Sequence, residues 1–422
     1  MSSLRDRSIG IAALGLSGVA AYLFLAIAGR SLGAADFSSI GALWAVVFLA
    51  TAALAAPLEM AVARDVGTAR GRGAPLRPSV REGFVLSAIV AISAIGAALL
   101  AGGWLDSAVF GGQPGFSLAA GVAFAGLTVG AAAKGACAGG NRLAGWGGYS
   151  LVDGGTRLGL SVVAAMIAPH PASFALALAV GPWLGLAAPA VSLRRLLASD
   201  AGHAVRGGVA ALARSTAPLV VAAAASAALT YLGAVMLPVL VPGPNAQVGA
   251  YIAALALARL PLFAFSPLVA IAVPRIASAL ETGDAVAARR TAAMLMAIAA
   301  AGGLVVVVLS FVAGGGSLAS LFGADFSLPA ASLAAIGVAS ACWLLATAAT
   351  SVAIAAGHGR LAAAAWFAGL VGALAAAAAA GPGAFDRTDA AVVLGALVAV
   401  IGAGLAAIAA LSSQRGPPRA AT

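Results

Sequence analysis

Three charged side chains lie where the sequence predicts the middle of a membrane. Asp153 and Arg157 stand four residues apart in the apolar segment 147–168, and Arg259 lies in the apolar segment 249–274. At 1.5 Å per residue, the two arginines each lie about 15 Å from one end of their segment, and Asp153 about 10 Å. Each such charge costs about 2.5–3.5 kcal/mol at the bilayer centre on an insertion scale. Charges kept at that depth indicate a functional site, an ion pair, or both.

Two interpretations account for these charges. An acid four residues before a base lies on the same helix face, so Asp153 and Arg157 could neutralise each other. The segment that carries Arg259 contains no acid, and arginine can grip a phosphate group with two parallel hydrogen bonds. The alternative is therefore an anion-binding cavity lined by Arg157 and Arg259, in which Asp153 holds Arg157 or changes protonation. Glu59, about one turn from the end of segment 40–63, is a further cavity candidate, with pairing to Arg64 as its alternative.

Composition decides what surrounds these charges. The chain has 422 residues, of which 62% are hydrophobic and 9% charged, whereas a soluble protein carries about 25% charged residues. This predicts a polytopic membrane protein. The first apolar run, 9–29, is long enough to span and lacks a clear cleavage pattern, so we expect it to remain as a signal anchor. The net charge of +10 comes from arginines and a single lysine in or beside short loops, which favours membrane orientation over nucleic-acid binding.

Apolar runs predict about 12 transmembrane helices, because an open sheet edge cannot be satisfied in lipid. Pro57, Pro218, Pro261, Pro267 and Pro274 interrupt the second, seventh and eighth of them and predict kinks. The predicted spans are 9–29, 40–63, 84–105, 116–136, 147–168, 172–193, 215–241, 249–274, 291–313, 328–356, 361–380 and 390–412.

Lysine and arginine counts predict the orientation. With the N-terminus inside, the cytoplasmic segments hold nineteen basic residues, Lys134 among them, and the outer segments hold two, Arg30 and Arg387. This bias predicts that both termini are cytoplasmic. Arg30, near the outer edge, is expected to extend its charge into the interface.

An internal repeat divides the chain. The segment 100–112 resembles 312–324, 56–66 resembles 266–276, and 138–144 resembles 356–362, all in order at nearly one offset. Since six spans separate the copies, the halves share one orientation, which predicts a parallel repeat of two six-helix lobes. The expected division is an N-terminal lobe 1–197, a cytoplasmic linker 198–214, and a C-terminal lobe with a short tail, 215–422.

The remaining reactive residue types support no enzyme. Cys137 and Cys342 both fall in apolar segments and are expected to be buried and unreactive. The three histidines lie in loops or at span ends, and the chain has no GxxxxGK[ST] loop, so neither a metal centre nor nucleotide hydrolysis is predicted. We expect no cofactor.

Several stretches resemble polysaccharide flippases of the Wzx type, in the superfamily of multidrug, oligosaccharidyl-lipid and polysaccharide (MOP) exporters. They are AGRSLGAADFSSIGALWAVVFLATAALAAPLEMAVAR, GGNRLAGWGGYSLVDGGTRLGL, ALARLPLFAFSPLVAIAVPRIASALETGD, LFGADFSLPAASL and AAGHGRLAAAAW. The resemblance is diffuse and covers nearly the whole chain. It implies a bundle in the bacterial plasma membrane that alternates between inward- and outward-open states and carries a saccharide on a polyprenyl phosphate or diphosphate.

The sequence therefore predicts a transporter of a lipid-linked saccharide, whose phosphate Arg157 and Arg259 would bind. Its expected partners are that substrate, membrane lipid, H⁺ or Na⁺ as candidate coupling ions, and glycan-assembly proteins, but no nucleic acid. One alternative is a drug or metabolite antiporter of the same superfamily, which favours more acids than arginines in the cavity. Another is a component of a polysaccharide assembly complex that does not transport. A glycan polymerase or ligase would need a sizeable outer loop, and the outer loops are short.

Overall fold

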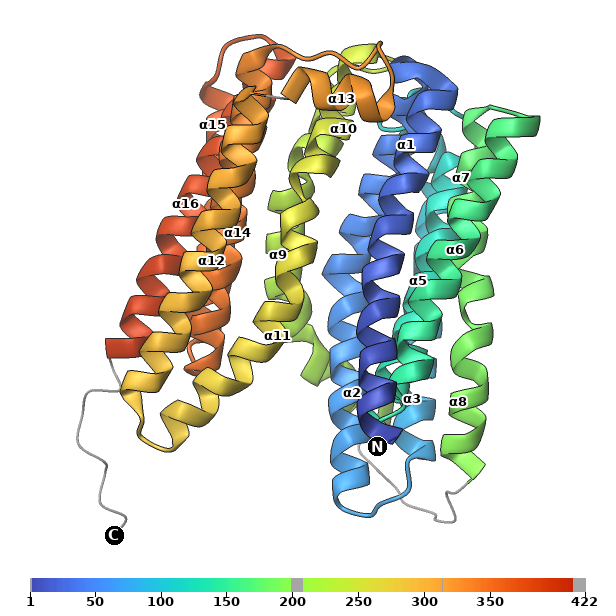
Figure 1. Cartoon of the computed structure of the whole chain (residues 1–422). Helices are drawn as coiled ribbons and strands as arrows, with labels where there is room; N and C mark the ends of the chain where they lie inside the picture. The colour runs from blue at the N-terminus through green and yellow to red at the C-terminus, as the bar shows by residue number, and fades with distance from the viewer. Residues whose placement is uncertain (1, 199–207, 313, 413–422) are drawn as a thin grey trace. The chain divides into compact units, whose positions relative to one another are not determined.

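Helices make up every regular element that the structure describes (Figure 1). The computed structural model describes residues 2–198, 208–312 and 314–412. These residues form two compact units. The predicted all-helical class is confirmed.

Unit 1 contains most of the first half of the chain and two short segments of the second. It holds the described residues up to Ala227, together with Ala234–Ala253 and Leu318–Ser327. Its elements are α1 (Ser2–Ala50), the π-helix η1 (Thr51–Ala55), α2 (Ala56–Gly71), α3 (Arg77–Leu100), α4 (Gly102–Ala108), α5 (Phe116–Gly139), α6 (Leu143–Ile167), α7 (Pro171–Gly185) and α8 (Ala187–Ala198), with parts of α9 (Gly208–Leu240), α10 (Ala246–Ala258) and α13 (Gly314–Phe322).

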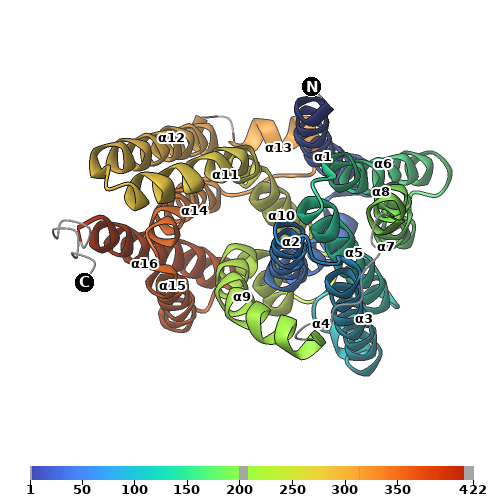
Figure 2. The same ribbon diagram turned by 90° about the horizontal axis from the view of Figure 1, so that it is seen from below.

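Unit 2 is a bundle of long helices from the second half. Here α12 packs on α14, α14 on α16, and α16 on α15 (Figure 2). Its elements are α11 (Leu260–Glu281), α12 (Ala285–Val312), α14 (Ala330–Ala355), α15 (Gly359–Ala379) and α16 (Ala384–Ser412), with the Ala228–Gly233 part of α9 and the end of α10.

Small residues bring the helices of both units into close contact. A Cβ atom added at Gly139 of α5 would lie 2.5 Å from the Ala63 carbonyl oxygen of α2. In unit 2, a Cβ at Gly369 of α15 would lie 2.8 Å from the Gly395 oxygen of α16. Without a hydrophobic driving force in lipid, such close backbone approach is what lets membrane helices associate.

The long helices account for the predicted spans. Ten stretches of the described residues are long and apolar enough to cross a membrane. One of them, Gly15–Gly71, has 57 residues, which at 1.5 Å per residue is enough for two crossings. It bends at Gly33, whose φ of 74° and ψ of 168° leave the helical region that residues with a Cβ prefer. The pair α10 and α11, which is interrupted at Arg259, covers the predicted span 249–274, and its part Ala246–Leu262 is a shorter apolar helix.

The predicted domain boundaries stay a prediction. The linker 198–214 lies in large part outside the described residues, and α9 begins within it at Gly208. Of the predicted kinks, that at Pro261 coincides with the start of α11, and Pro57 follows the π-helix at the start of α2. Pro218 lies inside the continuous helix α9.

Candidate functional site

Asp153 and Arg157 form a closed ion pair inside unit 1. Arg157 Nε donates to Asp153 Oδ1 at 2.7 Å, and Arg157 Nη2 donates to Asp153 Oδ2. The spacing of four residues on α6 makes this contact possible. Both residues are only 5% exposed.

Two neighbouring helices cover this pair. The Arg157 guanidinium carbon lies 5.4 Å from the centre of the Phe48 ring on α1, a cation–π arrangement. On α7, a Cβ atom added at Gly181 would lie 2.5 Å from Arg157 Cγ and 2.9 Å from Asp153 Oδ1. Only a residue without a side chain lets α7 pass this close to the pair.

The ion pair that the first of the two interpretations expects, between Asp153 and Arg157, is present in the structure. Because both carboxylate oxygens accept from the guanidinium, the pair contributes little net charge to its surroundings. A binding role for either residue stays a prediction.

Arg259 lies at the break between α10 and α11 in unit 2. It is the residue before α11, which begins with Leu260 and Pro261, and it is 3% exposed. Its Nη2 donates to the Thr230 carbonyl oxygen, and its guanidinium carbon lies 3.9 Å from the centre of the Tyr231 ring. The carbonyl and the aromatic face fix the orientation of the guanidinium.

The break itself is stabilised by a neighbouring helix. The Ser340 hydroxyl of α14 donates to the carbonyl oxygen of Ala258, the last residue of α10. This bond satisfies a carbonyl group that the end of a helix would otherwise leave without an intrahelical donor. A membrane helix can be interrupted at depth only where such groups find partners.

Glu59 belongs to a second ion pair of unit 1. Its Oε2 lies 2.5 Å from Lys134 Nζ of α5, and its Oε1 accepts from Trp146 Nε1 of α6 at 2.7 Å. The alternative that paired Glu59 with Arg64 is wrong. The orientation count places Lys134 among the cytoplasmic basic residues, but its side chain, on α5, forms an ion pair with Glu59 of α2.

Tyr149 connects the two pairs of unit 1. Lys134 Nζ lies 5.8 Å from the centre of its ring, its hydroxyl donates to the Gly126 carbonyl at 3.2 Å, and Asp153 follows one turn later on α6. Sequence reasoning missed Lys134, Tyr149 and, in unit 2, Tyr231. The one available signal was that the only lysine of the chain falls inside a predicted span.

The structure thus places the predicted site residues in two groups. Glu59, Asp153 and Arg157 share unit 1, whereas Arg259 belongs to unit 2. Among the described residues, no group of three or more His, Cys, Asp or Glu side chains could hold a metal ion.

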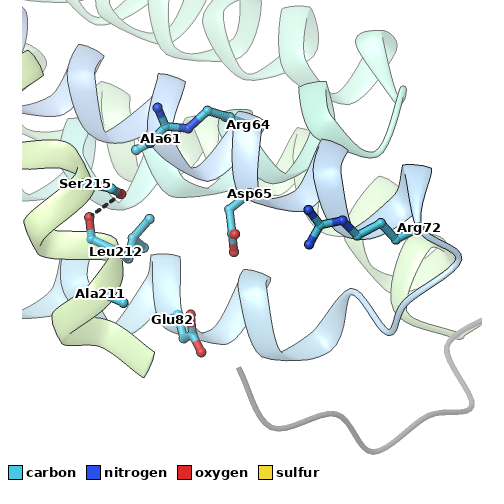
Figure 3. A pocket seen from close by; sticks show the side chains of 8 residues that line it. All are labelled: Ala61, Arg64, Asp65, Arg72, Glu82, Ala211, Leu212 and Ser215. Carbon is cyan, nitrogen blue, oxygen red and sulfur yellow. Dashed lines mark hydrogen bonds between the residues drawn. The ribbon is translucent and has the colours of Figure 1, made fainter. Parts of the chain in front are cut away.

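A separate pocket of about 310 Å³ lies in unit 1, between α2, α3 and α9 (Figure 3). None of the predicted site residues lines it. Two arginines and two acids line its charged part, so its formal charge is balanced. Its lining residues are Ala61, Arg64, Asp65, Arg72, Glu82, Ala211, Leu212 and Ser215.

The chain matches no protein-family model and no curated protein sequence. Solved structures do share its fold. An inward-facing multidrug resistance MATE family transporter of the MOP superfamily has a TM-score of 0.75 at 15% identity, over 98% of this chain and 100% of that one. An outward-facing structure of such a transporter has a TM-score of 0.69 at 16% identity, over 98% and 96%.

A third solved structure differs in its description. It is a MOP superfamily transporter from Pyrococcus furiosus, described for a reverse polarity of its binding pocket that suggests a different function. Its TM-score is 0.64 at 15% identity, over 98% of this chain and 93% of that one. Together these matches show that the chain is a multi-pass membrane protein with the fold of MOP superfamily transporters.

Proposed function

We propose that this protein is a secondary transporter that moves a lipid-linked saccharide across the bacterial plasma membrane by alternating access. Arg259 carries the proposal. A buried guanidinium is oriented at a helix break inside the membrane by Tyr231 and the Thr230 carbonyl. A broken membrane helix is where transporters of many folds place their substrate, and a guanidinium suits a phosphate group.

The contrast with Asp153 and Arg157 supports Arg259 as the primary phosphate ligand. The guanidinium of Arg157 is already engaged by a carboxylate and covered by α7. Arg157 therefore serves the proposal as a second, weaker candidate. The description of the Pyrococcus furiosus protein supports the idea that the charge of the pocket separates functions within this fold.

A second candidate is a drug or metabolite antiporter. The solved structures with the highest similarity quoted above are multidrug resistance transporters, and this is the observation that favours it. Such a protein would take a cationic substrate, which a central arginine repels.

Transport in proteoliposomes separates the two candidates. The purified protein is offered a fluorescent polyprenyl-diphosphate saccharide in one set of vesicles and the cationic dye ethidium in another. Movement of the saccharide that is lost in Arg259→Ala and kept in Arg290→Ala, an exposed arginine of α12 in the same unit, supports the proposal. Ethidium transport without saccharide movement supports the antiporter, and movement of neither overturns both.

A further inference from the structure

A short segment of the second half of the chain is bound to α1 of unit 1. Phe322 and Phe326 flank the end of α13, and both are 1% exposed. Their ring centres lie 5.6 and 5.4 Å from that of Phe37 on α1, and 5.3 Å from each other. Aromatic rings at these separations and inclinations attract one another beyond the area that they bury.

A polar clasp lies beside this aromatic cluster. Arg30 of α1, itself exposed, donates from Nε to the Leu321 carbonyl at 2.9 Å and from Nη2 to the Ser320 carbonyl. These carbonyls belong to the last turn of α13, where the helix dipole favours a positive charge. The expected extension of Arg30 toward the interface thus has a specific acceptor.

The backbone of α1 is shaped to receive this segment. A Cβ atom added at Gly29 would lie 2.7 Å from Phe322 Cδ1 and 3.1 Å from Phe326 Cζ. The bend at Gly33 follows one turn later. The docking place is thus defined by a residue without a side chain and by a break in the helix.

The connections of this segment make the contact unusual. Leu318–Ser327 belongs to unit 1, yet the chain on both sides of it, Ala254–Ser317 and the residues from Leu328 on, belongs to unit 2. The segment Leu318–Ser327 is therefore joined at both ends to unit 2 by the chain itself. Its contact with α1 includes the rings of Phe37, Phe322 and Phe326 and the side chain of Arg30.

The first copy of the internal repeat contains the same Phe-Gly pair but makes a different aromatic contact. Phe110 and Gly111 correspond to Phe322 and Gly323 at the offset of 212. In the first copy, Phe110 packs on Phe116 of the adjoining helix α5, with ring centres 6.1 Å apart. Asp106 of α4 also stabilises the turn between α4 and α5, because its carboxylate accepts a hydrogen bond from Ser117 N at 2.7 Å.

The second copy cannot be tied down in this way. At the position that corresponds to Asp106 it carries Leu318, which is 1% exposed. Asp106, which hydrogen-bonds the turn between α4 and α5, therefore corresponds to Leu318, whose apolar side chain makes no hydrogen bond.

We propose that Leu318–Ser327 is a releasable latch. It docks on α1 at the predicted outer end of the membrane in one state of the transport cycle and detaches in the other. The inference rests on the proposed transport function for its role, and on the contacts of Arg30, Phe322 and Phe326 for its existence. Docking by a small aromatic cluster and two hydrogen bonds at the water interface is weak enough to be reversed.

Distance measurement tests whether the latch moves, without reference to any substrate. In a background with Cys137→Ala and Cys342→Ala, spin labels are placed at Ser31→Cys and Ala319→Cys, next to the clasp but outside it. A latch gives a short and a long distance in lipid nanodiscs, and Phe322→Ala increases the ratio of long to short by about tenfold or more, because a buried aromatic side chain is lost. Labels at Ser107→Cys and Leu118→Cys, across the α4 and α5 corner, should give one distance. One unchanged distance at the latch in both proteins overturns the proposal.

Cross-linking tests what the latch does. A reducible thiol-specific cross-linker joining Ser31→Cys to Ala319→Cys should stop transport of whichever substrate moves in the proteoliposome assay, and a reductant should restore it. The linked control pair should transport normally. Unchanged transport with the latch linked overturns its role. If no substrate moves even in the unlinked protein, the proposed transport function has failed, while the distance measurement still decides whether the latch exists.

Discussion

Arg157 and Arg259 are the same residue type at the same predicted depth, yet the two units hold them differently. In unit 1, Arg157 is bound by the carboxylate of Asp153 on its own helix. In unit 2, Arg259 interrupts the helix and is held by the Thr230 carbonyl and the Tyr231 ring. Arg157 thus contacts a carboxylate of its own helix, whereas Arg259 contacts a carbonyl and a ring from another helix, α9. The two sites therefore differ in what removal of each side chain should do.

The largest effect is expected at Arg259. Arg259→Ala should lower saccharide transport about a hundredfold or more, because each of two charge-assisted hydrogen bonds to phosphate contributes about 1.5–3 kcal/mol. Arg259→Lys should recover little of the rate, because a point charge cannot make two parallel bonds. The measurement is the initial rate in proteoliposomes at matched protein density. A lysine variant that transports normally would contradict a two-bond grip.

Asp153→Asn should act on stability rather than first on transport. It leaves the buried Arg157 without its carboxylate, which costs about 3–5 kcal/mol. The expected result is a lower midpoint of thermal unfolding in detergent and less protein in the membrane.

The double variant Asp153→Asn with Arg157→Gln is the matched control for that loss. With neither charge stranded, abundance and transport should both return toward the unchanged protein, if the pair is structural. Normal abundance with no transport would show instead that Arg157 also binds the substrate. Arg157 and Arg259 would then share the same role.

Tyr231→Leu should have an intermediate effect. Loss of the aromatic face under the Arg259 guanidinium removes about 2 kcal/mol of orientation in a desolvated site, so the apparent affinity for the saccharide should fall more than tenfold. Tyr231→Phe keeps the ring and should retain most of that affinity. Equal losses in the two variants would assign the role to the hydroxyl instead of the ring.

The smallest effect is expected at the second ion pair of unit 1. The Glu59 and Lys134 side chains are 19% and 21% exposed, so the pair is screened more than that of Asp153 and Arg157. Glu59→Gln combined with Lys134→Met should change stability by no more than about 1 kcal/mol, measured by thermal unfolding. A loss as large as that of Asp153→Asn would mean that Tyr149 couples the two pairs into one network.

Local spacing predicted the contacts that lie within one helix. Asp153 and Arg157 are neighbours on α6 because residues four apart share a helix face. The partner of Glu59 could not be found in this way, since Lys134 lies 75 positions later and reaches it only when α5 packs on α2. The docking of Phe322 on Phe37 is equally remote in sequence, and its repeat counterpart Phe110 makes a different contact.

The sequence by itself determined that this chain is a helical membrane protein with charges at membrane depth. Composition and apolar run length suffice for that, because lipid admits only elements that satisfy their own backbone. Only the tertiary structure decided which groups each of these charges contacts. The energy of a buried charge depends on the atoms within a few ångströms of it, and those atoms come from other helices: Phe48 and Gly181 beside Arg157, Tyr231 and Thr230 beside Arg259.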